Sequence, residues 1–128
     1  MTLISNCAPD LLVFPDYDGN GMFKSLGNIA ANSQVGLLFI AMGEAPKRLR
    51  VNGRAEIVRD DPAMAAVPGA QLLIKVTPAA IFPNCPRYIP NLQLTEASPY
   101  LPKAGEPPIE PKWKSFEIFA DVVPPRRR

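Results

Sequence analysis

The spacing of apolar side chains changes sharply within the first third of the chain. Residues 11–14 form a short apolar run typical of a β-strand, and Pro15, which lacks an N–H group, is expected to end its hydrogen bonding. Residues 16–21 are rich in Asp, Asn and Gly and predict a tight turn. A short helix with Asp18 or Asn20 as N-cap should follow, because apolar residues then recur at helical spacing: Met22, Phe23, Leu26, Ile29 and Ala30.

Two strands are expected after this helix. Residues 35–40 are almost entirely apolar and predict a buried strand, whereas from Arg48 onward polar and apolar residues alternate, which predicts a half-buried antiparallel strand. Gly53 interrupts the apolar row and leaves room for a β-bulge or for the close approach of another group. The apolar face carries Leu49, Val51, Ala55 and Ile57, and the polar face carries Arg48, Arg50, Asn52, Arg54 and Glu56.

Prolines recur throughout the second half of the chain. Residues 60–67 predict a short capped helix with an early proline, and a strand is expected at residues 72–76. Residues 81–90 contain three prolines and should be rigid and extended, while residues 98–111 contain five and cannot form regular helix or sheet. The chain is therefore expected to be one domain, residues 1–128, in which residues 98–128 form a proline-rich C-terminal wrap.

Composition narrows the possible partners. The 128 residues are enough for one domain, and 47% hydrophobic content is enough for a single core. The formal charge of +2 depends on the three terminal arginines, since the remaining 11 basic and 12 acidic side chains give −1. A nearly neutral folded part argues against nucleic-acid binding, and the terminal arginines are expected to be a frayed tail.

Two cysteines, Cys7 and Cys85, lie too far apart in the sequence to suggest a disulfide framework. The N-terminus lacks the features of a signal peptide, and the longest apolar run, residues 35–42, is too short to cross a bilayer. We therefore expect a cytoplasmic protein without a membrane partner.

The chain contains no histidine, which removes whole classes of mechanism. A Ser-His-Asp triad, a Cys-His dyad and a histidine-ligated metal are all excluded, and two distant cysteines do not make a zinc site. If the protein is catalytic, the difficult chemistry should come from a bound cofactor that the protein positions.

Two groups of residues could hold a phosphorylated cofactor. The N–H groups at the helix start, together with Lys24 and Ser25, could bind a phosphate; the alternative is an ordinary turn followed by a solvated lysine. The arginines of the alternating strand could bind a phosphate or an electron-rich ring; the alternative is the solvent-facing side of a sheet. The residues alone leave both alternatives open.

Three segments occur in an order and at intervals that are fairly specific: FPDYDGNGMFKSLGNIAANSQVGLLFI, then RLRVNGRAEI, then GAQLLIKVTPAAIFPNCPRYI. Over residues 12–90 the chain thereby resembles the FMN-binding split barrels related to pyridoxamine 5′-phosphate oxidase. The resemblance implies a mainly β fold, an antiparallel Greek-key split β-barrel with one or two short helices. It also implies a homodimer that binds FMN in clefts shared by both subunits.

The resemblance assigns roles by position. Lys24 and Ser25 fall where the family contacts the FMN phosphate, and the loop from Asp16 to Asn20 lies beside that phosphate. Arg48 falls where a polar side chain faces the edge of the isoalloxazine ring. Arg50 lies on the same strand face and is also a candidate, although we expect it to face solvent or a carboxylate of the other subunit. The implied function is an FMN-dependent oxidoreductase acting on an unknown small-molecule substrate; the alternative is a non-catalytic split barrel that binds a ligand or only dimerises.

The chain departs from the family pattern in two ways. First, Phe23-Lys24-Ser25 offers one cation where the oxidase has Ser-Arg-Lys. Second, the segment before residue 12 is short, so we expect the family's first strands to be lacking.

The roles of four further residues stay open as pairs of alternatives. Cys85, Arg87 and Tyr88 either line a cleft at the dimer interface or belong to a packed connector. Trp113 either anchors local packing or has a functional role, which would be to stack on the flavin or to gate the substrate.

Overall fold

The computed structural model describes residues 10–123, so Cys7 and the terminal arginines at 126–128 lie outside the described residues. The described chain contains four strands: β1 (Leu12–Tyr17), β2 (Gln34–Ala41), β3 (Lys47–Val58) and β4 (Ala70–Asn84). It also contains one α-helix, α1 (Lys24–Ala31), and three 3₁₀ turns: η1 (Pro62–Ala66), η2 (Lys112–Ser115) and η3 (Glu117–Phe119).

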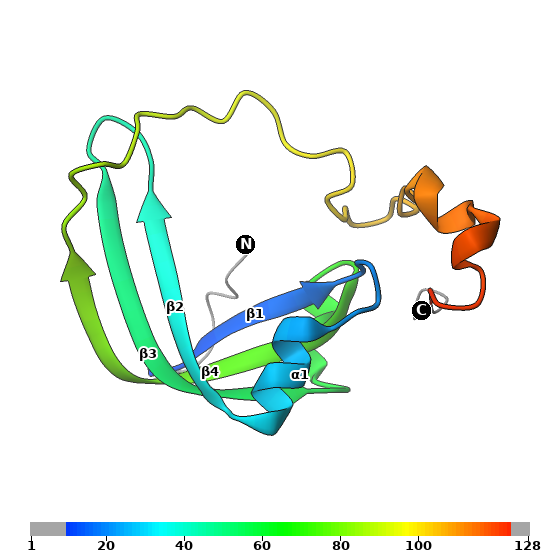
Figure 1. Cartoon of the computed structure of the whole chain (residues 1–128), viewed down its shortest axis with the longest axis horizontal. Helices are drawn as coiled ribbons and strands as arrows, with labels where there is room; N and C mark the ends of the chain where they lie inside the picture. The colour runs from blue at the N-terminus through cyan, green and yellow to red at the C-terminus, as the bar shows by residue number, and fades with distance from the viewer. Residues whose placement is uncertain (1–9, 124–128) are drawn as a thin grey trace.

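The four strands form one antiparallel sheet in the order β1-β4-β3-β2. Strands β2, β3 and β4 are consecutive neighbours, and β1 lies beside β4, which is a Greek-key arrangement. The sheet curls strongly into half of a barrel, and α1 lies across its inner side (Figure 1). The expected mainly β split-barrel fold is confirmed.

The irregularity expected at Gly53 is present. Asn52 pairs with Ala80 and Gly53 pairs with Pro78, so β4 carries one extra residue, Ala79, at this point. A Cβ atom on Gly53 would lie 2.3 Å from the backbone oxygen of Thr77, which no side chain can tolerate without a shift of the backbone. The glycine therefore permits the close approach of β4, and the bulge helps the sheet to bend.

The prolines did not end the strands where the sequence suggested. β1 continues through Pro15 to Tyr17, and β4 runs well beyond residue 76 to Asn84 through Pro78 and Pro83. The physical reason is that each proline lies on an edge of the sheet. Among residues 10–123, β1 has β4 as its only neighbour, and β4 pairs with β1 only as far as Val76. An edge position leaves one side of the strand without ladder bonds, so a missing N–H is tolerated there.

The expected start and N-cap of the helix are wrong. α1 begins at Lys24 rather than Met22, and its N-cap residue is Phe23, which adopts a left-handed backbone with φ of 47° and makes no side-chain capping bond. The amide oxygen of Asn20 instead accepts a hydrogen bond of 3.0 Å from the N–H of Met22. Asn20 therefore closes the turn before the helix and does not cap the helix itself.

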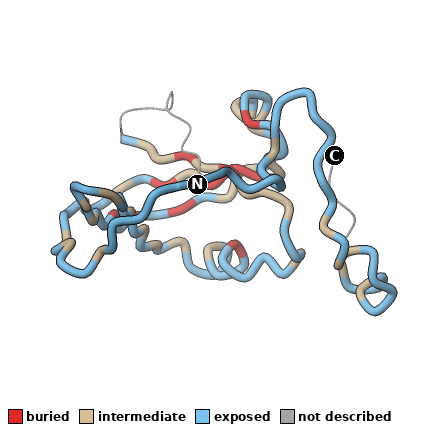
Figure 2. Tube along the Cα trace, turned by 90° about the horizontal axis from the view of Figure 1, so that it is seen from above, coloured by how far each residue is buried: buried red, intermediate tan, exposed pale blue. Residues whose placement is uncertain are grey.

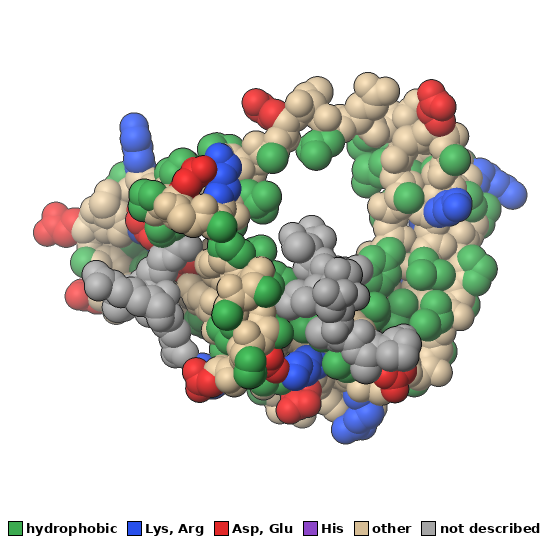
Figure 3. Space-filling model, turned by 180° about the vertical axis from the view of Figure 1, so that it is seen from behind, with side chains coloured by type: hydrophobic (Ala, Val, Ile, Leu, Met, Phe, Trp, Pro, Cys, Tyr) green, Lys and Arg blue, Asp and Glu red, His purple; other side chains and the backbone are tan. Residues whose placement is uncertain are grey.

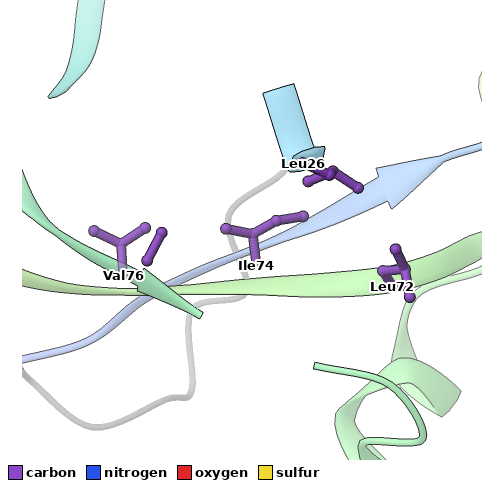
Figure 4. Close-up of a cluster of buried hydrophobic side chains, with 5 residues drawn as sticks. Leu26, Leu72, Ile74 and Val76 are labelled. Atoms are coloured by element: carbon purple, nitrogen blue, oxygen red, sulfur yellow. The ribbon is translucent and has the colours of Figure 1, made fainter. Parts of the chain in front are cut away.

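A core cluster lies between α1 and the inner face of the sheet, and Val13 and Leu73 are buried outside this cluster. Leu26 is the buried residue of α1 and packs against Ile74 and its neighbours on β4 (Figure 4). Buried positions run along the middle of the sheet, while most of the remaining chain is exposed (Figure 2). The buried cluster under the helix consists of Leu26, Ala55, Leu72, Ile74 and Val76.

The apolar strand at residues 35–40 is not buried as expected. β2 is an edge strand, and its residues alternate between half-buried and exposed, with Leu38 47% exposed and Ile40 40% exposed. The apolar face of β3 is buried at Val51 and Ala55, but Leu49 is 38% exposed. The arm of the sheet formed by β2 and the adjoining ends of β3 and β4 therefore exposes apolar side chains.

The expectation that residues 98–111 form no regular helix or sheet is confirmed. Residues 85–111 form neither helix nor strand, run past the open side of the sheet and reach η2 and η3 near the turn between β1 and α1 (Figure 1). An opening separates this segment from the curled sheet (Figure 3). Trp113 packs edge-on against Phe119 with ring centroids 5.8 Å apart, so it does anchor the packing of the terminal turns. Within residues 10–123, no helix is long and apolar enough to cross a membrane.

Candidate functional site

One face of α1 borders a cavity of about 600 Å³. Four of its polar lining residues, called here the polar rim, come from β1, the glycine-rich turn and the start of α1: Asp16, Asn20, Lys24 and Ser25. Asn28, Asn32 and Gln34 also line the cavity. The apolar lining from the sheet, with Ile29 from the helix, is called here the apolar floor and contains Phe14, Val35, Leu37 and Ile74. A cavity of this size that combines apolar surface with polar groups is typical of small-molecule sites.

Four of the six predicted site residues meet at this cavity. Asp16 reaches it from β1, Asn20 from the glycine-rich turn, and Lys24 and Ser25 from the first turn of α1. The helix has no acidic residue in its first turn, and the first N–H groups of a helix have no partner within it. These N–H groups, the Lys24 ammonium and the Ser25 hydroxyl together form a set of donors suited to an anion.

The other two predicted residues are not in this cavity. Arg48 pairs with Ile40, close to the loop that joins β2 to β3. The cavity residues Val35 and Gly36 lie near the opposite end of β2. Its Nε atom is buried and has no hydrogen-bond partner among the described residues. Arg50 is exposed and donates from Nε to the Oδ1 atom of Asn84 at 2.5 Å. Within one chain, Arg50 is therefore held by an amide of the neighbouring strand.

Asp16 brings a negative group to the same rim. Burial raises the pKa of its carboxyl group above the ordinary value, and the nearby carboxylate of Asp18 raises it further. The Oδ2 atom of Asp16 is buried and has no hydrogen-bond partner among the described residues. The protonated form of Asp16 would be a donor toward an anion, whereas its ionised form would repel one.

Asp18 is tied to the C-terminal segment. Gln71 donates from Nε2 to Asp18 Oδ1 at 3.2 Å, and the Lys114 ammonium forms an ion pair with Oδ2. The side chains of Lys114 and Asp18 are only 12% and 17% exposed. The sequence reasoning missed Lys114, and no sequence signal marks it, because its partner lies 96 residues away.

A second cavity of about 680 Å³ also borders the glycine-rich turn, through Asp18, Gly19 and Asn20. Tyr17, Tyr100 and Trp113 line it, and Lys114 and Asp18 contribute to its wall. Asn20 lines both cavities. Trp113 thus borders this second cavity and not the one that holds Lys24.

The segment around Cys85 is open to solvent. Cys85 and Arg87 are exposed, and Tyr88 is 86% exposed, so the segment is not a packed connector within one chain. A place at a dimer interface stays a prediction. In the part of the chain that the structure describes, no group of three or more His, Cys, Asp or Glu side chains could hold a metal ion.

Comparison with known families gives one match. A family model described as pyridoxamine 5′-phosphate oxidase matches residues 1–99. No curated protein matches the chain at a significant level. The matched range contains the whole sheet, α1 and the first cavity, and it ends before Tyr100, Trp113 and Lys114 of the second cavity.

Proposed function

Because the chain belongs to the pyridoxamine 5′-phosphate oxidase family, we propose that it binds FMN and acts as a flavin-dependent oxidoreductase on a small-molecule substrate. The observation that supports this most is the first cavity, whose lining combines Lys24, Ser25 and Asn20 at the start of α1 with apolar side chains of the sheet. Family membership alone would not suffice, since one fold can host many functions.

The polar rim suits the phosphate of FMN. Lys24 supplies a positive charge, Ser25 a hydroxyl donor, and the first turn of α1 supplies N–H groups at the positive end of the helix dipole. Asn20 uses its amide oxygen to accept from Met22, which leaves its amide NH₂ as a donor. The buried, unpartnered Oδ2 of Asp16 can join these donors once it is protonated.

The apolar floor suits the ring system. Phe14, Val35 and Leu37 offer a surface on which a flat, largely apolar heterocycle can lie while excluding water. A bound flavin would supply the capacity to accept and donate a hydride or electrons, and the protein would supply position and charge.

Arg48 is the candidate that stabilises negative charge on the reduced ring, but it lies outside the first cavity of its own chain. We propose that the protein is a homodimer and that Arg48 of one copy approaches the flavin of the other. Its buried Nε without a partner and the exposed apolar residues on the same arm of the sheet support a contact there.

A non-catalytic split barrel is the second candidate. It is favoured by the single cation of the phosphate rim, by the carboxyl group of Asp16 beside it, and by the separation of Arg48 from the cavity. This protein would bind a ligand or dimerise without redox chemistry.

The decisive experiment is equilibrium dialysis of the purified, folded protein against FMN, followed by its visible spectrum. We expect saturable binding and a flavin spectrum that bleaches reversibly with dithionite. A demonstrably folded sample that binds no FMN at near-millimolar concentration would refute the proposed function. Binding without turnover of any reduced pyridine nucleotide or oxygen would favour the non-catalytic candidate.

A further inference from the structure

The glycine-rich turn, residues 18–21, lies between β1 and α1 and therefore sets where the polar rim of the first cavity lies. Its backbone is unusual, because Gly21 and Phe23 both adopt a positive φ, of 74° and 47°. A positive φ is unfavourable for phenylalanine, so contacts with the surrounding structure must hold this conformation. One such contact is local: the amide oxygen of Asn20 accepts a hydrogen bond from the Met22 N–H at 3.0 Å.

Asp18 anchors the same turn to two other parts of the fold. Gln71 of β4 donates from Nε2 to its Oδ1 atom at 3.2 Å, and the Lys114 ammonium of η2 forms an ion pair with its Oδ2 atom. Both side chains of this ion pair are largely buried, so salt and water screen it less than a surface pair. The C-terminal turns, which Figure 1 shows beyond the end of β1, thereby fasten the glycine-rich turn.

The charge of Asp18 reaches the polar rim. Burial raises the pKa of the Asp16 carboxyl group, and the carboxylate of Asp18 raises that pKa further, so the two groups interact. Lys114 offsets part of this charge and is shared, because its Nζ atom also lies 4.0 Å from Oε2 of the half-exposed Glu110. Two carboxylates and one ammonium give this cluster a net charge of −1, which would become −2 without Lys114.

We propose that Lys114 is a positioning residue for the polar rim: it clamps the glycine-rich turn and limits the repulsion that Asp18 exerts on a phosphate bound there. Lys114 is not among the residues that line the first cavity, so it acts through Asp18 and not on the phosphate directly. It also lies outside residues 1–99, the range that matches the family model. This proposal rests on the proposed FMN function of the first cavity.

The test is a double-mutant cycle on FMN affinity, measured by equilibrium dialysis at low ionic strength. Lys114→Met should weaken FMN binding about two- to sixfold, the effect of one uncompensated unit charge at roughly 4–8 Å in water-like surroundings. Riboflavin, which lacks the phosphate, should lose little. The same change made in Asp18→Asn should not weaken FMN binding, because no carboxylate is then left at this position to repel the phosphate.

Three further variants separate charge from packing. Lys114→Arg keeps the positive charge and should bind FMN like the wild type. Lys112→Met removes an equal charge from an exposed position of the same turn and should change the affinity of neither ligand. Asp18→Asn alone should bind FMN more tightly than the wild type, and it tests the same ion pair if Lys114→Met does not fold. A loss that is equal for FMN and riboflavin, or that persists in Asp18→Asn, would overturn the proposal.

Amide hydrogen exchange of the ligand-free protein separates this proposal from the one on which it rests. Lys114→Met should speed exchange over residues 18–25, whereas Lys112→Met should not. Tight FMN binding that Lys114→Met leaves unchanged, with unchanged exchange, would overturn the clamp and keep the flavin function. A wild type that binds no FMN, with faster exchange over residues 18–25 in Lys114→Met, would overturn the flavin function and support the clamp.

Discussion

Lys24 is the residue on which phosphate recognition most depends, because it is the only cation that lines the first cavity among the described residues. We expect Lys24→Ala to weaken FMN binding by about 10- to 150-fold, since removing a charge-assisted hydrogen bond costs about 1.5–3 kcal/mol. Riboflavin, which lacks the phosphate, should lose little. Calorimetric titration of both ligands checks this, with the exposed Lys47→Ala as a control outside the cavity. Equal losses for FMN and riboflavin would place Lys24 away from the phosphate.

Asp16 should make FMN binding dependent on pH. Burial and Asp18 raise the pKa of Asp16, so the carboxyl group stays protonated above its ordinary range and ionises as the pH rises further. Once ionised, it repels the phosphate, and affinity for FMN should fall; a unit charge about 4 Å away in water-like surroundings corresponds to ~1 kcal/mol, about fivefold. Dissociation constants measured from pH 4 to about pH 8 should therefore diverge between the wild type and Asp16→Asn at the upper end. Parallel curves for the two proteins would contradict this role.

The same raised pKa affects stability with a definite sign. Because the folded state holds the proton more tightly than the unfolded state, ionisation of Asp16 destabilises the fold as the pH rises from the ordinary aspartate pKa through the raised one. Asp16→Asn removes this penalty, so the variant should gain stability relative to wild type at neutral pH and lose that advantage in acid.

Arg48 should tune the flavin without binding its phosphate. A guanidinium beside the reduced ring stabilises its negative charge, so Arg48→Ala should lower the reduction potential of the bound flavin while FMN affinity changes little. Arg50→Ala is the matched control on the same strand face, because its guanidinium is held by Asn84. Spectroelectrochemical titration distinguishes the two. An effect at Arg50 with none at Arg48 would mean that the assignment is displaced by two residues along β3.

At the level of elements, the pairing of β3 with β4 depends on a glycine. Gly53→Ala would place a Cβ atom 2.3 Å from the Thr77 oxygen, and we expect a loss of about 1–3 kcal/mol in the free energy of unfolding, as for overpacked cores. Gly27→Ala is the control, because nothing lies within 4 Å of its added Cβ and alanine favours the helix by roughly 0.5–1 kcal/mol. Urea unfolding measures both. A neutral Gly53→Ala would show that β4 can move away without cost.

At the level of the whole molecule, we expect a partner to cover the exposed apolar arm of the sheet, which is formed by β2 and the adjoining ends of β3 and β4. Leu38, Ile40 and Ile81 are 47%, 40% and 60% exposed, and the outer edge of β2 has no partner strand among the described residues. Such surfaces are normally covered, so we expect a homodimer that buries more than about 1,000 Å². Light scattering coupled to size exclusion should show a dimer for wild type and a weakened one for Ile81→Asp. Leu94 is 87% exposed and lies in the irregular segment of residues 85–111, so the control variant Leu94→Asp should remain dimeric. A stable wild-type monomer would refute the dimer.

The sequence by itself determined the elements whose pattern is local. Alternation from Arg48 identified β3, the interrupted apolar row located the bulge at Gly53, and the prolines excluded regular helix or sheet at residues 98–111. Four of the six predicted site residues meet at one cavity because they lie within ten residues of each other on one turn and helix start. Short-range geometry of this kind depends only on neighbouring residues.

The tertiary structure decided whatever depends on distant partners. Pro15 does not end its strand because β1 is an edge strand, and Pro83 does not end β4 because it lies beyond Val76, where β4 no longer pairs with β1. Arg48 is separated from the first cavity by the register of β2 on β3, and Lys114 reaches Asp18 from 96 residues away. Spacing along the chain fixes which residues share a face, but edges, registers and long-range ion pairs arise only when the strands are assembled into a sheet.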